Sequence, residues 1–156
     1  MKAIILTAGN TDKFSGKKLD LPHCLLEINN IPLIFYTLYN CQKCGINDVI
    51  IITGFKKEKI PAVIGKSFSS MNIKFIENKN FNNTTTAYSL YQAKNIIDDD
   101  VVVIDGDILF SHEGLKEIKN SNNSNSIISV PMTGNGLEAC IYDVDNKVEL
   151  LIVRDE

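Results

Sequence analysis

The sequence predicts an α/β fold built around a mainly parallel, doubly wound sheet. Short apolar or alternating runs of strand length recur at residues 2–7, 48–53, 72–77 and 101–105. Stretches with helical periodicity separate these runs. Strands that are buried under helices on both faces read as near-continuous apolar segments, and a regular alternation of strands with helices is typical of a parallel sheet.

The first half of the chain supplies two strands and two helices. Residues 2–7 form an apolar strand that leads into a loop of small residues, and residues 32–44 follow with helical spacing. In this helix Ile34, Leu38 and Cys41 share one face, and Gly45 stands just past the end. Residues 48–53 are a buried strand, and residues 56–64 are a short helix in which Pro61 predicts an early break or a kink.

The second half continues the alternation. Residues 72–77 alternate as a strand, and residues 86–97 form a helix with Leu90, Ala93 and Ile97 aligned. The most apolar strand, 101–105, precedes a helix at 111–119. After a polar loop at 120–125, strands are expected over three ranges, of which the last two form a hairpin across Asp145–Asn146: residues 126–131, 138–143 and 147–153.

Composition favours one cytoplasmic domain that spans residues 1–156. A chain of 156 residues with 44% hydrophobic content can bury a sizeable core. A net charge of −3 without a basic face argues against nucleic acid as a partner, and no apolar run approaches the length that spans a membrane. The four cysteines are expected to be reduced and buried. Cys41 and Cys44 have the spacing of zinc or redox sites, but no second pair accompanies them.

The loop after the first strand is the first candidate binding element. Ala8 and Gly9 allow a ligand to approach the backbone, and consecutive loop N–H groups can bind phosphate oxygens. Open α/β sheets place ligands at the carboxyl ends of their strands, where this loop begins. Lys13, Lys17 and Lys18 follow, either as cations for phosphate groups or as an ordinary solvated loop.

A second candidate is Asp105–Gly106–Asp107, directly after the most apolar strand. Two carboxylates at a strand end, with glycine allowing a tight bend, suit a hard cation such as Mg²⁺. A plain turn is the alternative.

These residues resemble the signature of the nucleotidyltransferases that activate sugar phosphates and phosphocholine. Eight positions stand in register with that signature: Leu6, Ala8, Gly9, Pro22, Leu25, Ile28, Pro32 and Leu33. Three positions depart from it, because Thr11 replaces a Gly, Lys13 an Arg and His23 a Lys. The resemblance implies a three-layer α/β/α sandwich of the nucleotide-diphospho-sugar transferase kind, shortened at the C-terminus. Residues 1–110 would bind nucleotide, and residues 111–156 would begin the acceptor-binding part.

The resemblance also implies an activity, which is Mg²⁺-dependent nucleotidyl transfer from an NTP to a phosphorylated acceptor with release of pyrophosphate. CTP is favoured, with phosphocholine or a sugar 1-phosphate as the acceptor. Lys13 would contact the β- and γ-phosphates, His23 takes the place of a catalytic lysine, and Asp107 would bind the metal with Asp105 second. The nucleotide would be lined by Leu6, Ala8, Gly9 and Asn10.

Residues 78–89 resemble a segment of the phosphocholine cytidylyltransferases that opens a helix. Ser89 matches this segment, whereas Thr85 and Thr86 replace two asparagines. These three residues are expected near the base or acceptor, and the alternative is a plain helix N-cap formed by Thr85 or Thr86. A rival interpretation is a degenerate domain that binds nucleotide or a partner without catalysis. Weak turnover of this shortened chain is expected, and a homodimer is left open.

Overall fold

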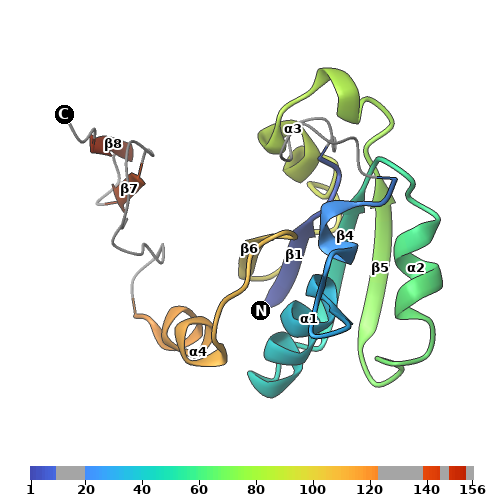
Figure 1. Cartoon of the computed structure of the whole chain (residues 1–156). Coiled ribbons are helices and arrows are strands. Elements are labelled where there is room, and N and C mark those ends of the chain that lie inside the picture. Colours follow the sequence, from blue (N-terminus) through green and yellow to red (C-terminus); the bar gives the residue numbers. More distant parts are fainter. Residues whose placement is uncertain (10–19, 123–138, 145–147, 154–156) are drawn as a thin grey trace.

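The structure is a computed structural model that describes residues 1–9, 20–122, 139–144 and 148–153, the last two ranges as backbone only. Its centre is a four-stranded parallel sheet in the order β5-β4-β1-β6 (Figure 1). The strands are β1 Lys2–Leu6, β4 Asp48–Thr53, β5 Asn72–Glu77 and β6 Val101–Asp105. All four lie at or within one residue of the predicted ranges, and the predicted α/β fold with a parallel sheet is confirmed.

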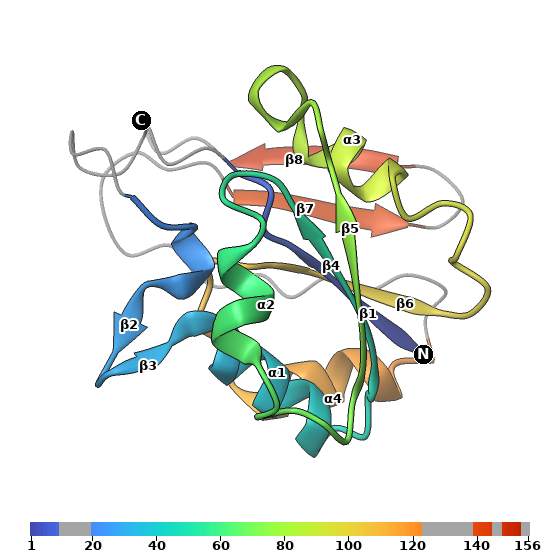
Figure 2. The same cartoon turned by 90° about the vertical axis from the view of Figure 1, so that its right-hand side faces the viewer.

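Helices cover both faces of this sheet and make it the middle of three layers (Figures 1 and 2). Side chains alternate along β1, so that Ala3 and Ile5 face one core cluster and Ile4 faces the other. The first cluster is closed by residues of three helices, and the second by residues around the fourth. These helices are α1 Leu33–Lys43, α2 Lys59–Ile64 and α4 His112–Asn120 on the first face, and α3 Thr86–Tyr91 on the second.

Helix α1 ends in a Schellman motif, as Gly45 predicts. Gly45 has a φ of 70° and donates its N–H to Gln42 O at 3.0 Å. Ile46 donates to Cys41 O at 2.9 Å, and both Cys41 and Ile46 are buried. The C-x-x-C pair therefore lies at the end of a core helix. Burial raises the pKa of the Cys41 thiol to about 12, which keeps it neutral at physiological pH.

Two predicted helices are shorter in the structure than in the sequence analysis. Helix α2 begins at Lys59 rather than residue 56, which places Pro61 in the first turn, where a missing N–H costs nothing and no kink results. Helix α3 ends at Tyr91 rather than residue 97. Beyond it the backbone continues with tighter i→i+3 bonds, Ala93 N to Leu90 O and Ile96 N to Ala93 O.

That tighter spacing changes which side chain enters the core. With three residues per turn, Leu90, Ala93 and Ile96 share a face and pack against the second cluster. Ile97, which α-helical spacing predicts to be aligned with them, is 37% exposed instead.

Two short antiparallel pairs complete the described residues. Strands β2 Glu27–Ile28 and β3 Ile31–Pro32 are joined by Asn29 and Asn30, both with positive φ as hairpin turns of this length require. Strands β7 Ala139–Val144 and β8 Val148–Val153 pair antiparallel, which confirms the predicted hairpin. The strand expected at residues 126–131 lies outside the described residues. None of the described helices has the length and apolar character of a membrane span.

We expect Thr37→Val to stabilise the fold. Thr37 is buried in α1, and its hydroxyl has no hydrogen-bond partner among the described residues. A buried, unsatisfied hydroxyl costs about 1–3 kcal/mol, and valine fills the same space without it. Urea unfolding should therefore show a free energy of unfolding higher by about 1 kcal/mol. A lower value would contradict the assignment of Thr37 as unsatisfied.

Candidate functional site

A cavity of about 490 Å³ opens at the carboxyl edge of the sheet. This volume is in the range of small-molecule binding sites. Its walls come from the end of β1, the turn after β6, the segment after Pro22 and the segment before and within α3. The lining residues are Leu6, Thr7, Ala8, Gly9, His23, Cys24, Phe81, Asn82, Thr84, Thr85, Thr86, Ser89, Asp105, Gly106 and Asp107.

The strand order explains why the cavity forms at this position. The chain passes from β1 outward to β4 and β5, and then returns to place β6 on the other side of β1. The connection after β1 leads to α1 on one face, whereas the connection that returns from β5 to β6 carries α3 on the other face, and a crevice is left where the strand order reverses. Ligands of open α/β sheets bind at such a switch point, outside the carboxyl ends of the strands.

Gly106 sets the distance between the two sides of this crevice. Its N–H donates to Leu6 O at 2.9 Å, which extends the pairing of β1 and β6 beyond the end of β6. A Cβ on Gly106 would lie 2.6 Å from Thr7 Cγ2 and 2.8 Å from Leu6 O. The sequence predicts that Gly106 is needed for a tight bend, but its φ is not positive. Close approach to β1 is what excludes a side chain.

Gly9 and Gly54 differ in how much space surrounds them. Among the described residues, none lies within 4 Å of a Cβ built on Gly9, which leaves room for a ligand beside it. A Cβ on Gly54 would lie 2.7 Å from Ala8 O and 2.8 Å from Phe81 Cβ. Gly54 thus allows the loops after β1 and β5 to meet behind the cavity.

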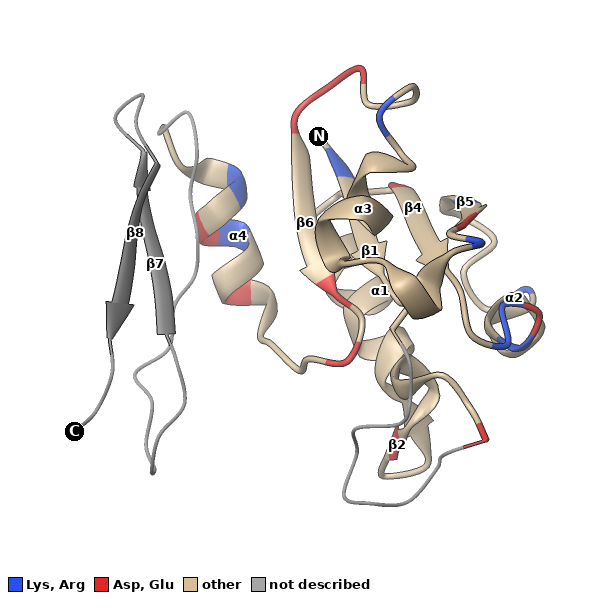
Figure 3. Ribbon diagram, turned by 90° about the horizontal axis from the view of Figure 1, so that it is seen from above, with Lys and Arg blue, Asp and Glu red and all other residues tan. Residues whose placement is uncertain are grey.

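Asp105 and Asp107 supply the negative charge of the cavity. Asp105 is the last residue of β6, and Asp107 follows it after Gly106 (Figure 3). Although the Asp105 side chain is accessible to solvent, desolvation at the sheet edge raises the pKa of its carboxyl, and the neighbouring Asp107 adds to the rise. A cation between the two carboxylates would offset this repulsion.

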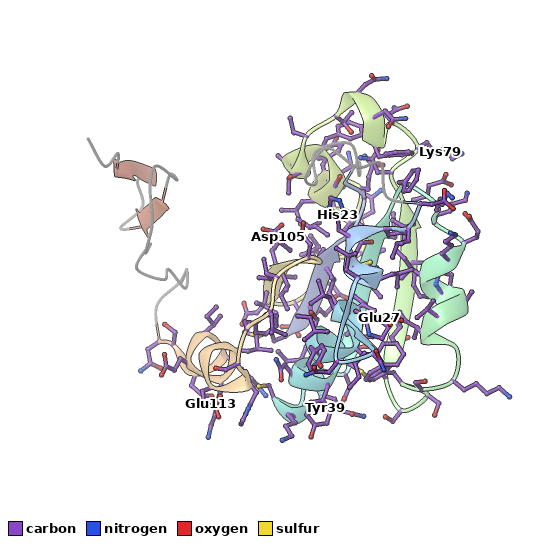
Figure 4. All side chains as sticks on the ribbon, viewed as in Figure 1. His23, Glu27, Tyr39, Lys79, Asp105 and Glu113 are labelled. Atoms are coloured by element: carbon purple, nitrogen blue, oxygen red, sulfur yellow. The ribbon has the colours of Figure 1, made fainter. Side chains whose placement is uncertain are left out.

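His23 faces the acidic pair from the opposite side. It begins the short 3-10 turn His23–Leu25, its side chain is 16% exposed, and its Nδ1 lies 3.6 Å from Asp107 Oδ2. Figure 4 shows His23 and Asp105 near each other beneath α3. The next residue, Cys24, is buried, and desolvation raises the pKa of its thiol to about 12. The thiol is therefore neutral and a poor nucleophile.

The remaining wall is uncharged. Thr85 is the N-cap of α3, since its hydroxyl accepts the N–H of Tyr88 at 3.4 Å, and the predicted N-cap role is confirmed. Thr86 and Ser89 from the same helix also line the cavity, together with Phe81. The rings of Phe55 and Phe81 meet edge to face, with 6.5 Å between their centroids.

The loop after Gly9 returns to the same sheet edge. Asp20, the first described residue after this loop, accepts hydrogen bonds from Lys56 and Lys59, which follow β4. The hydrogen bond and charge of Lys56, with the charge of Lys59, lower the pKa of the Asp20 carboxyl. Both ends of the loop are thus attached near the carboxyl ends of β1 and β4.

Nine of the eleven residues proposed from the sequence lie together in this cavity: Leu6, Ala8, Gly9, His23, Thr85, Thr86, Ser89, Asp105 and Asp107. Asn10 and Lys13 lie outside the described residues. The roles assigned to all of them remain predictions. Sequence reasoning missed Phe81, Asn82 and Thr84, although they stand in the segment whose resemblance it noted.

A family model described as a domain of unknown function (DUF6564) matches residues 25–152 of this chain. The chain belongs to this family. It is also a distant homologue of the nucleotidyltransferases. It is 31% identical over 112 residues to the choline-phosphate cytidylyltransferase of Streptococcus pneumoniae, which is 72% of this chain and 47% of that protein.

A second relative is the D-glycero-alpha-D-manno-heptose 1-phosphate guanylyltransferase of Aneurinibacillus thermoaerophilus. The identity is again 31% over 112 residues, which is 70% of this chain and 47% of that protein. The chain thus spans about half the length of these two curated relatives.

Solved structures show the same fold. HddC from Yersinia pseudotuberculosis, complexed with GMP-PN, aligns with a TM-score of 0.70 and 21% identity over 98% of this chain and 68% of that chain. The CTP:phosphocholine cytidylyltransferase from Streptococcus pneumoniae aligns with a TM-score of 0.67 and 24% identity over 98% and 64%. These likenesses establish the nucleotidyltransferase fold of the sheet and its helices.

We expect Gly9→Ala and Gly106→Ala to have opposite consequences. An added methyl on Gly106 meets Thr7 and the backbone of Leu6, so this variant should lose stability by about 1–3 kcal/mol. Gly9→Ala should unfold like the parent chain, because no described residue lies within 4 Å of the added methyl, but it should weaken the binding of any ligand that occupies the cavity. Thermal unfolding without ligand measures the loss of stability in Gly106→Ala, and thermal unfolding with a nucleotide added measures the loss of binding in Gly9→Ala. A Gly106→Ala variant as stable as the parent would contradict the close packing of β1 and the turn.

Proposed function

We propose that this chain binds a nucleoside triphosphate and a small phosphorylated acceptor and transfers the nucleotidyl group between them. The observation that carries the proposal is that one cavity brings together the Gly9 loop, the acidic pair Asp105 and Asp107, and an uncharged wall before and within α3. Homology to nucleotidyltransferases supports the reaction class.

The reaction places few covalent demands on the protein. A phosphate oxygen of the acceptor attacks the α-phosphorus of the triphosphate, a new P–O bond forms, and the bond to the β-phosphate breaks as pyrophosphate leaves. Rates in such reactions come from holding the attacking and leaving oxygens in line and from stabilising negative charge. The rigid edge formed by β1 and the turn after β6 would hold both reactants.

The donor set of Asp105 and Asp107 fits Mg²⁺. Magnesium in nucleotide sites is held by one or two carboxylates, completed by phosphate oxygens and water. The described residues contain no group of three or more His, Cys, Asp or Glu side chains placed to hold a metal, which agrees with a site completed by substrate. When bound, the ion would neutralise phosphate charge.

The charge of the cavity makes that ion necessary. Among the described lining residues there are two aspartates and a histidine, but no lysine or arginine. A free triphosphate would therefore meet like charge at the acidic end. We propose that it enters as the magnesium complex, and that Lys13 in the loop after Gly9 adds positive charge at the β- and γ-phosphates.

CTP with phosphocholine is the first substrate pair that we propose. The relatives named for cytidine nucleotides include the choline-phosphate cytidylyltransferase and the CMP-5'-(3-aminopropyl)phosphonate synthase of Streptomyces rubellomurinus, 23% identical over 118 residues. A sugar 1-phosphate is the second acceptor, as the name of the heptose 1-phosphate guanylyltransferase suggests.

A second candidate function is nucleotide or partner binding without turnover. The observation that favours it is His23, which stands where related signatures have a lysine and lies 3.6 Å from Asp107. An imidazole carries no fixed positive charge, so the phosphate group would lack a permanent cation at this position.

We expect an NTP and Mg²⁺ together to raise the melting temperature more than the sum of their separate effects. The reason is that the ion would bridge phosphate oxygens and the acidic pair. Linkage gives about 2.7 kcal/mol at a hundredfold excess over Kd. Differential scanning fluorimetry with the four common NTPs tests this.

Asp107→Asn should remove the Mg²⁺-dependent part of the shift while the fold remains intact. Glu113→Gln is the matched control, because Glu113 lies at the exposed start of α4 and does not line the cavity. This variant should keep the Mg²⁺-dependent part of the shift. If no NTP shifts the melting temperature in millimolar Mg²⁺, the proposed function is wrong.

We expect His23→Lys to increase pyrophosphate release from a low starting rate. A charge-assisted hydrogen bond contributes about 1.5–3 kcal/mol, which corresponds to about one to two orders of magnitude in rate. A coupled pyrophosphate assay with CTP and phosphocholine, and then with sugar 1-phosphates, measures it. An unchanged rate with intact nucleotide binding would favour the binding-only alternative.

A further inference from the structure

Asn78 is a fully buried polar side chain that hydrogen-bonds to two residues of the uncharged cavity wall. It lies just past the end of β5 and is 1% exposed. Its backbone N–H donates to Thr53 O at 2.8 Å, which ties it to β4. Its side chain reaches three groups of the wall, namely the Asn80 N–H and the hydroxyls of Thr84 and Ser89.

The direction of each of these hydrogen bonds follows from one group. The backbone N–H of Asn80 can only donate, and it lies 3.0 Å from Asn78 Oδ1. The amide nitrogen of Asn78 must therefore face the other way, towards Thr84 Oγ1 at 2.9 Å and Ser89 Oγ at 3.0 Å. Since an amide nitrogen can only donate, both hydroxyl oxygens accept from Asn78.

The hydroxyl protons are committed as well. Thr84 Oγ1 donates to Asn80 O at 2.9 Å, and Ser89 Oγ donates to Thr85 O at 3.5 Å. A hydroxyl has one proton and two lone pairs. Each oxygen thus has one lone pair left, and both residues line the cavity. Thr84 is partly exposed, so a ligand in the cavity could donate to its oxygen, whereas Ser89 is only 6% exposed and is less accessible.

The position of this wall indicates which part of a ligand it meets. The acidic pair lies on the β6 side of the cavity and would attract the metal and phosphates. The wall that holds Thr84 and Ser89 carries no charged side chain among the described lining residues, and Phe81 adds an apolar residue to it. An uncharged, planar ligand group with polar edges fits this surface.

We propose that Asn78 directs the hydroxyls of Thr84 and Ser89 to select nucleobases that present an exocyclic amino group, over those that present a carbonyl at the same position. This inference rests on the proposed function and makes Thr84 a specificity-determining residue. Cytosine directs two N–H groups from N4 at the two acceptors. Uracil places a carbonyl oxygen at the same point, so that acceptors would face one another without a proton between them.

The test compares nucleotides that differ at this one group. Isothermal titration calorimetry in millimolar Mg²⁺ measures CTP against UTP, and ATP against ITP as the purine pair. In whichever pair binds more tightly, we expect the amino member to bind at least about tenfold tighter, the effect of about one net hydrogen bond.

Variants identify the residue responsible. Thr84→Val removes the acceptor and should narrow the amino-to-carbonyl ratio to about threefold or less, because one of two acceptors is lost. Thr84→Ser keeps the hydroxyl and should retain the ratio. Thr37→Val makes the same chemical change in the core of α1 and should leave the ratio unchanged. If Thr84→Val does not fold, the parent chain and Thr84→Ser decide the question.

The outcomes separate this inference from the function on which it rests. If none of the nucleotides binds, both are overturned. If nucleotides bind but UTP equals or exceeds CTP, or ITP equals or exceeds ATP, in the tighter pair, the specificity inference alone is overturned. A Thr84→Val variant that binds but retains the full ratio also overturns it, because discrimination would then arise elsewhere.

Discussion

The pairing of β1 with a parallel strand on each edge is the constraint on which the candidate site depends. β4 lies on one edge and β6 on the other, so the chain must reverse direction across β1. The hydrogen bond from Gly106 N–H to Leu6 O continues this pairing past the end of β6. It holds Asp105 and Asp107 beside the Gly9 loop although almost 100 residues of sequence separate them. Without this contact, the acids and the loop would be unrelated surface features.

The cavity has two chemically different sides. The β6 side is acidic, and the described lining residues offer no fixed positive charge to a phosphate. The opposite side is neutral, with hydroxyls whose orientation follows from Asn78. A magnesium nucleotide matches both sides at once, since the ion and phosphates meet carboxylates while the base meets hydroxyls. A purely anionic metabolite or an apolar ligand would match only one side.

Sequence patterns predict the two central strands well because β1 and β4 are almost entirely buried, and they predict the edge strand β5 from its alternation alone. The apolar runs of β1, β4 and β6 leave little freedom in where these strands begin and end. The helix at residues 86–97 was predicted too long, because α-helical and 3-10 spacing both align Leu90 with Ala93 and differ only at the choice of Ile96 or Ile97. Local periodicity cannot distinguish the two over a single turn.

Only those site residues that directly follow a predicted strand can be located from the sequence. Residues that follow strands, such as Gly9 and Asp107, can be located from the strands themselves. Gly54 and Asn78 act through close contacts with segments distant in sequence, and no local pattern reveals those contacts. The position of Asn78 directly after β5 can be predicted from the sequence, in the same way as that of Asp105 at the end of β6. Its burial and its hydrogen bonds cannot.

Manganese-induced line broadening in a ¹⁵N-correlated NMR spectrum tests the central claim most directly. Two acidic groups lie at opposite ends of β6: Asp105 with Asp107, and the run Asp98–Asp100, whose first two members pair with Lys2 and the N-terminal amine (Figure 3). With Mn²⁺ and a nucleoside triphosphate, our account predicts that the amide signals of Gly9, His23 and Gly106 broaden first. Broadening that begins instead at residues 98–100, or that spares Gly9, would contradict a shared metal–nucleotide site at the carboxyl edge of the sheet.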